Sequence, residues 1–363
     1  MLNDEQACDL LEGLVAIPSV SRDERAAGEF LVQQLGQLGF EARIDGAGNA
    51  IGTLGDRGPR IALVGHMDTV PGHIPVKRSE GRLFGRGSVD AKGCLATFVV
   101  ASARAAASGH LAARIEFVAC VEEEVASSKG ARHLVHSPAP DALVIGEPSG
   151  AHAVTTGYKG FLSARLSLRQ GLAHTAGEQV PVAALACQKY VELERLASQL
   201  DGQREALYER LLLHLGRVST ESDGLHEQAQ LDLRLRLPEH LPPELARRWL
   251  EESCEGWQVE SEGGVPAWCG PRTSPIARQL GRAIGARGAR ARYQRKTGTA
   301  DLNVLAPVWN CPSVAYGPGD SALDHTPNEH IVLDEYLEAC SILEEVLLAP
   351  GLVEQLTPNC ETS

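Results

Sequence analysis

The stretch "RIALVGHMDTV", residues 60–70, contains a short apolar run that changes abruptly to polar residues at His66 and Asp68. The same change occurs in "ARIEFVACVEEE", residues 113–124, and in "DALVIGEPSG", residues 141–150. Apolar runs of this length, followed by turn-forming or polar residues, are typical of buried strands in an α/β sheet. The sequence therefore predicts a central sheet whose strands each end next to a histidine or an acid.

Helical patterns surround these predicted strands. In "SRDERAAGEFLVQQLGQLGF", residues 21–40, Ser21 and Glu24 have capping-box spacing and precede an apolar stripe, which predicts a helix capped by Ser21. A glycine-rich loop leads into an alanine-rich helix in "GRGSVDAKGCLATFVVASARAAASG", residues 85–109. Two further helices are expected at "RTSPIARQLGRAIG" and "DEYLEACSILEEVLLAPG". Helices alternating with strands indicate a mostly parallel sheet sandwiched by helices.

The pattern changes near residue 155. Leucines alternate with polar residues in "GFLSARLSLRQG" and again in "AQLDLRLRLPEH", as they do in half-exposed antiparallel strands. We therefore expect a smaller α+β domain at residues 155–265. It is inserted into a larger, discontinuous α/β domain formed by residues 1–154 and 266–363.

The composition excludes several classes of protein. The chain has 363 residues, 43% of them hydrophobic, and a net charge of −13, which argues against general binding to nucleic acid or anionic membranes. The N-terminus lacks the basic residues of a signal peptide, and no window reaches 18 uncharged apolar residues, so we expect a cytoplasmic protein without a membrane span. The nine cysteines, from Cys8 to Cys360, form no C-x-x-C pair, which indicates reduced thiols.

The histidines and acids after the predicted strands are expected to meet, because open α/β sheets bind ligands at the carboxyl ends of their strands. Several carboxylates in one crevice repel one another unless a cation neutralises them. Imidazole and carboxylate together are ligands that suit Zn²⁺. A carboxylate shared between two ligand sets suits a centre with two metal ions. Taken singly, each residue has a simpler interpretation as a packed histidine, a turn or a solvated strand end. The set comprises His66, Asp68, Asp90, the triplet Glu122 to Glu124, Glu147 and His325.

At these positions the sequence resembles a known family. The ordered motifs "GHMDTVPG", "GRGSVDAKG", "EEE" followed by "SSKGA", "GEPSG" and "DHTPNEH" are similar to those of the co-catalytic zinc exopeptidases and deacylases. That family includes acetylornithine deacetylase, succinyl-diaminopimelate desuccinylase, aminoacylase and glutamate carboxypeptidase. The resemblance spans nearly the whole chain. It implies a metal-dependent amide hydrolase with a catalytic domain and an inserted lid domain that dimerises.

The resemblance also implies a role for each residue. Two divalent metal ions, Zn²⁺ with Co²⁺ as a substitute, would bind at the site. Asp68 would orient a metal-bound imidazole by accepting its free N–H. Glu123 would be the general base, which requires an irregular backbone after the strand because strict alternation would separate adjacent glutamates. Glu122 stands where the family usually has aspartate and is expected to be peripheral. The metal ligands would be His66 and Glu147 for one ion, Glu124 and His325 for the other, and Asp90 for both.

The predicted lid carries a further candidate. The segment "GLAHTAG" resembles the part of the family lid whose histidine reaches the active site of the partner subunit to stabilise the oxyanion, which implies this role for His174 and a homodimer. A surface histidine without such a role is the alternative interpretation.

The substrate is suggested by charge and by a closer resemblance. Residues 263–300 contain eight basic residues and no acid, which marks a positive surface for an acidic partner, although some of these arginines would also suit the solvent face of a helix. The motifs "GEPSG", "GYKG" and "RKTGTADLN" are similar to the branch of the family that releases lysine or ornithine from the terminal glutamate side chain of an acidic amino-carrier protein. Candidate substrate-binding residues are Lys159, Arg236 and Lys296.

Two other functions remain open at this point. A small-molecule deacylase acting on N-acetylornithine, N-acetylcitrulline or N-succinyl-diaminopimelate would keep the same metal site and differ in its lid and pocket. A non-catalytic binding protein on the same fold would have lost part of the ligand set, yet every expected position is occupied here. No nucleic-acid partner is expected for the basic stretch, which lacks interleaved aromatic residues.

Overall fold

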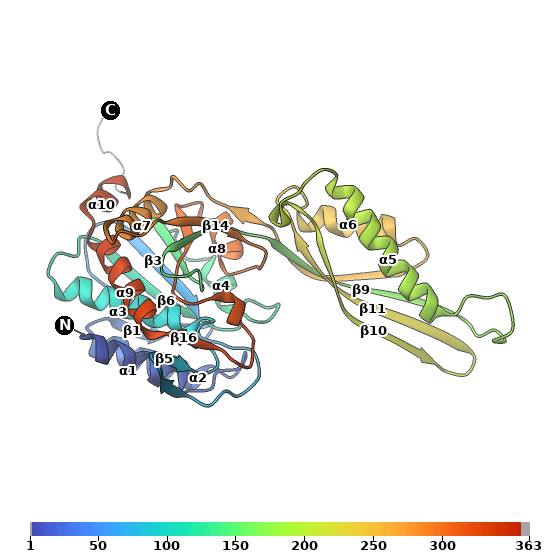
Figure 1. Ribbon diagram of the computed structural model, residues 1–363, viewed down its shortest axis with the longest axis horizontal. Helices are drawn as coiled ribbons and strands as arrows, with labels where there is room; N and C mark the ends of the chain where they lie inside the picture. Colours follow the sequence, from blue (N-terminus) through green and yellow to red (C-terminus); the bar gives the residue numbers. More distant parts are fainter. Residues whose placement is uncertain (1, 357–363) are drawn as a thin grey trace. The chain divides into compact units, whose positions relative to one another are not determined.

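The computed structural model describes residues 2–356, which fall into two compact units (Figure 1). The second unit begins at Tyr158, close to the start of the expected insertion at residue 155, and it also includes a short return segment near residue 297. Within the described residues, the first unit comprises residues 2–157, 270–295 and 300–356, and the second comprises residues 158–269 and 296–299.

The first unit contains a large mixed sheet. The order of its strands in this unit is β1-β2-β6-β3-β7-β15-β8, and β14 also pairs with β8. The central pairs β6–β3, β3–β7 and β7–β15 are parallel, whereas the pairs nearer the edges are antiparallel. The prediction of a mostly parallel central sheet is confirmed. The strands are β1 (Glu41–Ile44), β2 (Ala50–Leu54), β3 (Arg60–His66), β6 (Arg114–Cys120), β7 (Ala142–Gly146), β8 (Ala153–Tyr158), β14 (Arg292–Lys296) and β15 (Ser313–Ala315).

Helices pack beside this sheet because packing removes their apolar faces from water. Helix α9 contacts α1, α3 and α7, helix α1 also contacts α3, and α2 lies against β1 and β2 (Figure 1). All three predicted strands and the helices expected near residues 25, 95, 280 and 340 are present. The helices are α1 (Asp4–Val15), α2 (Arg25–Gln37), α3 (Lys92–Ala107), α4 (Lys129–Leu134), α7 (Pro275–Ala286), α8 (Leu302–Trp309), α9 (Leu333–Leu348) and α10 (Pro350–Leu356).

The predicted cap of α2 is wrong. The hydroxyl of Ser21 donates to Asp68 Oδ2 (2.7 Å) instead of capping the helix, which begins four residues later at Arg25 without any side-chain cap. Glu24 is buried, and its Oε1 accepts the backbone N–H of Arg22 (2.7 Å) and of Glu122 (3.1 Å). Ser21 and Glu24, which the local spacing assigned to a capping box, therefore both form hydrogen bonds with distant residues instead.

A small three-stranded sheet that the sequence did not predict lies in the same unit. It has the order β16-β5-β4 and is formed by β4 (Lys77–Ser79), β5 (Arg82–Phe84) and β16 (His330–Val332). The pairing of β16 with β5 joins a segment near the C-terminus to the loop that precedes α3. Strands of three residues are too short to give a period that can be recognised in the sequence.

The second unit has its own antiparallel sheet and core. Its strands have the order β10-β11-β9-β12, and the alternating leucines of β9 and β11 point into one hydrophobic cluster with α5 and α6, as expected. The opposite sheet face is polar. The elements are β9 (Gly160–Gly171), α5 (Val182–Asp201), β10 (Leu212–Ser222), β11 (His226–Leu237), α6 (Pro243–Ser253), β12 (Gln258–Val265) and β13 (Trp268–Cys269).

The described residues contain neither a membrane-spanning helix nor a disulfide. No helix within residues 2–356 is both long and apolar enough to cross a membrane. The eight cysteines between Cys8 and Cys340 form no disulfide with one another. The ninth, Cys360, lies outside the described residues.

Candidate metal centre

Asp90 lies between two imidazoles, one on each carboxylate oxygen. Its Oδ1 is 3.1 Å from Nε2 of His66, and its Oδ2 is 3.0 Å from Nε2 of His325. A carboxylate with a nitrogen ligand facing each of its two oxygens has the arrangement expected of a bridge between two cations.

Two further carboxylates extend the cluster on either side of Asp90. Oε1 of Glu124 is 3.0 Å from Nε2 of His325, and Oε1 of Glu147 is 3.9 Å from Nε2 of His66. Ligand atoms of His66, Asp90 and Glu124 all lie within 4.8 Å of one another, which is close enough for one ion to contact all three. The structure thus brings together all five residues expected as metal ligands.

Strand register explains why these residues meet. His66 is the last residue of β3 and is paired with Cys120, the last residue of β6, while Gly65 is paired with Gly146 at the end of β7. The residues that follow these three parallel strands therefore emerge at the same sheet edge. Asp90 is supplied by the loop before α3.

Asp68 holds several parts of the centre in place. Nδ1 of His66 lies 2.9 Å from the backbone carbonyl oxygen of Asp68 and 3.4 Å from its Oδ1. The fully buried carboxylate also accepts the backbone N–H groups of Glu123 and Glu124, both at 3.0 Å, and the hydroxyl of Ser21. Of the two Asp68 oxygens, the backbone carbonyl oxygen is the closer to Nδ1 of His66. With Nδ1–H donated to Asp68, Nε2 of His66 faces the cluster.

The three glutamates after β6 have different environments. The prediction of an irregular backbone here is confirmed, because Glu122 has a positive φ of 58°. The Glu122 carboxylate accepts a hydrogen bond from the Ser127 hydroxyl (2.7 Å) and lies 3.7 Å from the ammonium of Lys129, away from the cluster. Glu124 faces His325, and Glu123 is half-buried, with its backbone N–H donated to Asp68 Oδ1.

Burial and charge shift the pKa values of the centre. Burial raises the pKa of Glu123 well above its ordinary value; the nearby Asp301, Glu147 and Glu124 carboxylates add to this, and His66 opposes it. Hydrogen bonds with Asp90 and Glu124 raise the pKa of His325 to about 10. A carboxyl group with a raised pKa is suited to accept and return a proton near neutral pH.

The donor set fits divalent cations. Around Asp90 the structure places two imidazole nitrogens and two more carboxylates, with no thiolate among them, and this is the ligand type that Zn²⁺ and similar borderline ions accept. Without a metal ion, protonation of the two imidazoles would offset part of the negative charge of these carboxylates. Cation binding would displace those protons, because a metal ligand must present a lone pair.

Sequence reasoning missed several residues around the centre. Asp301 is buried, its carboxylate lies next to the thiol of Cys120, and burial raises its pKa to about 7. Glu329, which is 1% exposed, contacts the Asp90 loop. Both lie in motifs that the sequence singled out, "RKTGTADLN" and "DHTPNEH", but nothing in the spacing distinguishes them from surface acids.

The candidates in the second unit have mixed environments. Lys159 is fully buried, and its ammonium donates to the backbone carbonyls of Leu207, Tyr208 and Arg210. Its expected contact with the substrate stays a prediction. The Arg236 guanidinium donates to Thr299 Oγ1 (2.9 Å).

The other two candidates in this unit are more accessible. The backbone carbonyl of Lys296, at the end of β14, accepts the N–H of Lys159 (3.2 Å), and the Lys296 side chain is partly exposed. His174 lies in the exposed loop after β9, where its Nδ1 accepts the N–H of Ala176 (3.2 Å).

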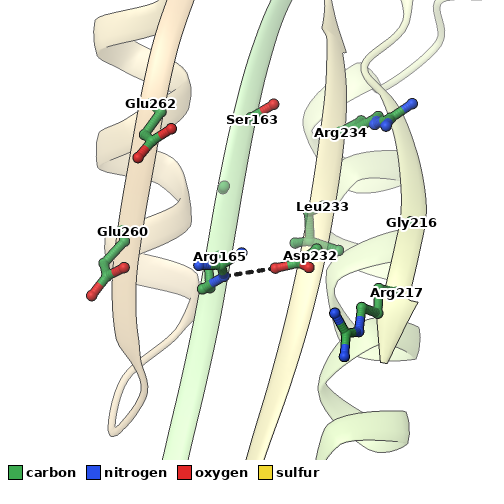
Figure 2. A pocket seen from close by; sticks show the side chains of 10 residues that line it. Ser163, Arg165, Gly216, Arg217, Asp232, Leu233, Arg234, Glu260 and Glu262 are labelled. Atoms are coloured by element: carbon green, nitrogen blue, oxygen red, sulfur yellow. Dashed lines mark hydrogen bonds and ion pairs between the residues drawn. The ribbon is translucent and has the colours of Figure 1, made fainter. Parts of the chain in front are cut away.

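A hollow of about 330 Å³ lies on the polar face of the second unit's sheet (Figure 2). Arg165 and Asp232 form a cross-strand ion pair of 2.8 Å at its centre, with Glu260 and Glu262 on β12 and Arg217 on β10. Mixed charges are expected on the solvated face of an antiparallel sheet, and the hollow is lined by no histidine or cysteine. The cluster around Asp90 is therefore the stronger candidate for a catalytic site.

Comparison with known proteins agrees with this choice. The model of peptidase family M20/M25/M40 matches residues 62–349. A LysW-lysine hydrolase of Deinococcus radiodurans is 40% identical over 351 residues, 95% of this chain and 97% of the relative. A LysW-lysine/LysW-ornithine hydrolase of Sulfurisphaera tokodaii is 30% identical, with 90% of each chain covered. A tripeptidase structure from Staphylococcus aureus superposes with a TM-score of 0.80 at 19% identity, covering 98% of this chain and all of that chain.

Proposed function

Because the chain belongs to peptidase family M20/M25/M40, we propose that it is a metal-dependent amide hydrolase that releases L-lysine, L-ornithine or both from an acidic amino-carrier protein of the LysW type. The scissile bond would join the amino acid to the side-chain carboxyl group of the carrier's C-terminal glutamate. The observation that carries the hydrolase assignment is Asp90 with one imidazole on each carboxylate oxygen. The carrier is supported by the names of full-length relatives.

The proposed centre holds two divalent metal ions, Zn²⁺ with Co²⁺ as a possible substitute. When bound, such ions polarise the amide carbonyl and favour ionisation of water at neutral pH. His66 and Glu147 would hold one ion, Glu124 and His325 the other, and Asp90 both. The contacts of Asp68 with His66 fix the direction of the imidazole, so that Nε2 is presented to the site.

Glu123 is the proposed general base and acid. Its carboxylate would take a proton from the attacking water and return it to the amino group that leaves. The raised pKa of Glu123 supports this role, because a carboxylate of ordinary acidity would accept a proton poorly at neutral pH. The backbone hydrogen bond to Asp68 holds the residue at the edge of the cluster.

The proposed enzyme is a cytoplasmic homodimer that assembles through the second unit, the lid. His174 of one subunit would donate a hydrogen bond to the oxyanion in the active site of the partner subunit. Arg236 and Lys296 are the candidates to hold the carboxylate of the released amino acid, because cationic donors form short, charge-assisted hydrogen bonds with carboxylates.

Subunit mixing tests the role of His174. The His174→Ala variant is expected to lose about 10²–10³ of kcat, as removal of one oxyanion donor does. Mixing it with inactive Glu123→Ala protein under conditions of subunit exchange is expected to restore up to about a quarter of wild-type activity, since half of the dimers then contain one intact site. No recovery, although mixed dimers form, would contradict action across the dimer.

The basic surface supports an acidic partner. Arg272, Arg282, Arg290 and Arg292 are exposed, and they make no ion pair within residues 2–356. Other arginines of this stretch have partners: Arg287 pairs with Glu345, and Arg278 donates to Gln355. In a chain of net charge −13, an unneutralised basic region attracts negatively charged macromolecules.

Salt dependence tests this surface. Raising the salt concentration from about 0.05 to 0.5 M is expected to increase KM for the carrier adduct several-fold with little change in kcat, because salt screens charges beyond the Debye length. The double variant Arg290→Gln and Arg292→Gln should have a higher KM and a weaker salt response. Arg57→Gln, which changes an exposed arginine outside this region, is the control. A KM that does not respond to salt would argue against a carrier protein as substrate.

The choice between substrate classes requires a direct comparison. We expect kcat/KM to be far higher for carrier-linked lysine or ornithine than for N-acetylornithine, N-acetylcitrulline or N-succinyl-diaminopimelate, measured with the same metal-loaded protein. The opposite order would identify a small-molecule deacylase. Absence of hydrolysis with every substrate by protein that binds two metal ions would favour a non-catalytic binding protein.

A further inference from the structure

Glu329 is almost completely buried, with 1% of its surface exposed, and all its side-chain hydrogen bonds go to one short segment of the chain. Its Oε1 accepts the backbone N–H groups of Val89 (3.0 Å) and Asp90 (3.2 Å). Its Oε2 accepts a hydrogen bond from the guanidinium of Arg86 (2.7 Å). One carboxylate therefore fixes residues 86–90 through three donors.

The ion pair of Glu329 with Arg86 explains how a charge is tolerated at this depth. A buried carboxylate without a cation or hydrogen-bond donors would be strongly destabilised. Arg86 is itself largely buried, with 15% of its side chain exposed, and it also donates to the carbonyl of Gly72 (3.3 Å). The pair is thus part of a fixed network and not a surface contact.

The segment from His325 to Glu329 contacts Asp90 at two points. His325 faces the Asp90 carboxylate, and Glu329, four residues later, holds the Asp90 backbone N–H. The strand β16 follows Glu329 directly and pairs with β5, just before Arg86. The backbone around Asp90 is therefore anchored to a sheet, so the direction of its side chain is set before any ligand binds.

We propose that Glu329 is a positioning residue that sets the geometry of Asp90 and thereby the affinity of both metal ions. This inference rests on the proposed two-metal function. A mobile Asp90 would lose entropy when it became fixed between two ions, whereas a backbone held in advance by Glu329 avoids that loss. Because Asp90 contacts both halves of the cluster, loss of Glu329 should weaken both ions together.

The test is metal binding by metal-free protein, measured by competition with a chelator of known affinity. Glu329→Gln retains the shape of the side chain but removes its charge. It is expected to weaken the binding of both Zn²⁺ ions by about 10- to 100-fold, the usual cost of losing a group that supports a metal ligand. Glu147→Gln should instead weaken one ion selectively, since Glu147 lies on the His66 side of Asp90 only.

Asp201→Asn is the matched control. Asp201 is also a buried acid, 2% exposed, that accepts a backbone N–H (Leu211, 2.8 Å) and lies 3.7 Å from an arginine, but it belongs to the second unit. Asp201→Asn should lower stability without changing metal affinity. If Glu329→Gln is folded and binds both ions as tightly as the wild type, the positioning role is wrong.

Two further measurements keep the proposal testable if Glu329→Gln does not fold. Arg86→Gln should weaken both ions in the same direction. In metal-free wild-type protein, the amide hydrogens of Val89 and Asp90 should exchange slowly because Glu329 accepts them; exchange at the rate of exposed loop amides would overturn the inference. Wild-type protein that binds no metal would contradict the proposed function itself, which is a different outcome.

Discussion

Replacing Asp90 by asparagine is expected to reduce amide hydrolysis by about a thousandfold or more while the protein remains folded. Asp90 is the only residue of the cluster that contacts both imidazoles, so its loss affects both proposed metal sites. The two ions are expected to contribute several kcal/mol of transition-state stabilisation, and each 1.4 kcal/mol corresponds to a factor of ten in rate.

The measurement for Asp90 combines metal content with kcat/KM on a carrier adduct. The Asp90→Asn variant should retain less than two ions per chain after dialysis. Asp232→Asn is a suitable control, because Asp232 pairs with Arg165 on the sheet of the second unit and has no place in the cluster. An Asp90→Asn enzyme with near wild-type activity would contradict the bridging role.

Replacing Glu123 by glutamine is expected to lower kcat by about 10²–10⁴ with metal content unchanged, because a positioned general base contributes a factor of that size. Glutamine has nearly the same shape as glutamate but cannot carry the proton. The adjacent Glu122→Gln variant is the control: its side chain contacts Ser127 and Lys129, so it should keep most of its kcat.

The metal content of Glu123→Gln distinguishes a metal ligand from a general base. If Glu123→Gln lost its metal ions, the residue would be a ligand and not the general base. If kcat stayed within a few-fold of the wild type with both ions bound, another group would have to transfer the proton.

Much of the centre was predictable because it depends on strand order. A polar residue after each of three adjacent parallel strands must appear at one sheet edge, so His66, Glu124 and Glu147 could be placed together from the apolar runs before them. The alternating leucines of the second unit were equally informative, since a period of two leaves one buried face.

Other features depend on contacts between distant segments, and local patterns could not reveal them. Ser21 had the spacing of a helix cap but donates to Asp68, 47 residues away. The burial of Lys159 could not be read from its sequence motif, because the three backbone carbonyls that accept from its ammonium lie about 50 residues later. Glu329 resembles any surface glutamate in the sequence, and its role appears only when residues 86–90 are placed beside it.

The most direct test of the account is release of free lysine or ornithine from a carrier adduct by metal-free protein before and after addition of Zn²⁺. The account predicts no release without metal and release that reaches its maximum at two ions per chain, with the amino acid detected by mass spectrometry. Equal release by the metal-free protein would contradict it, as would no release by protein with two bound ions.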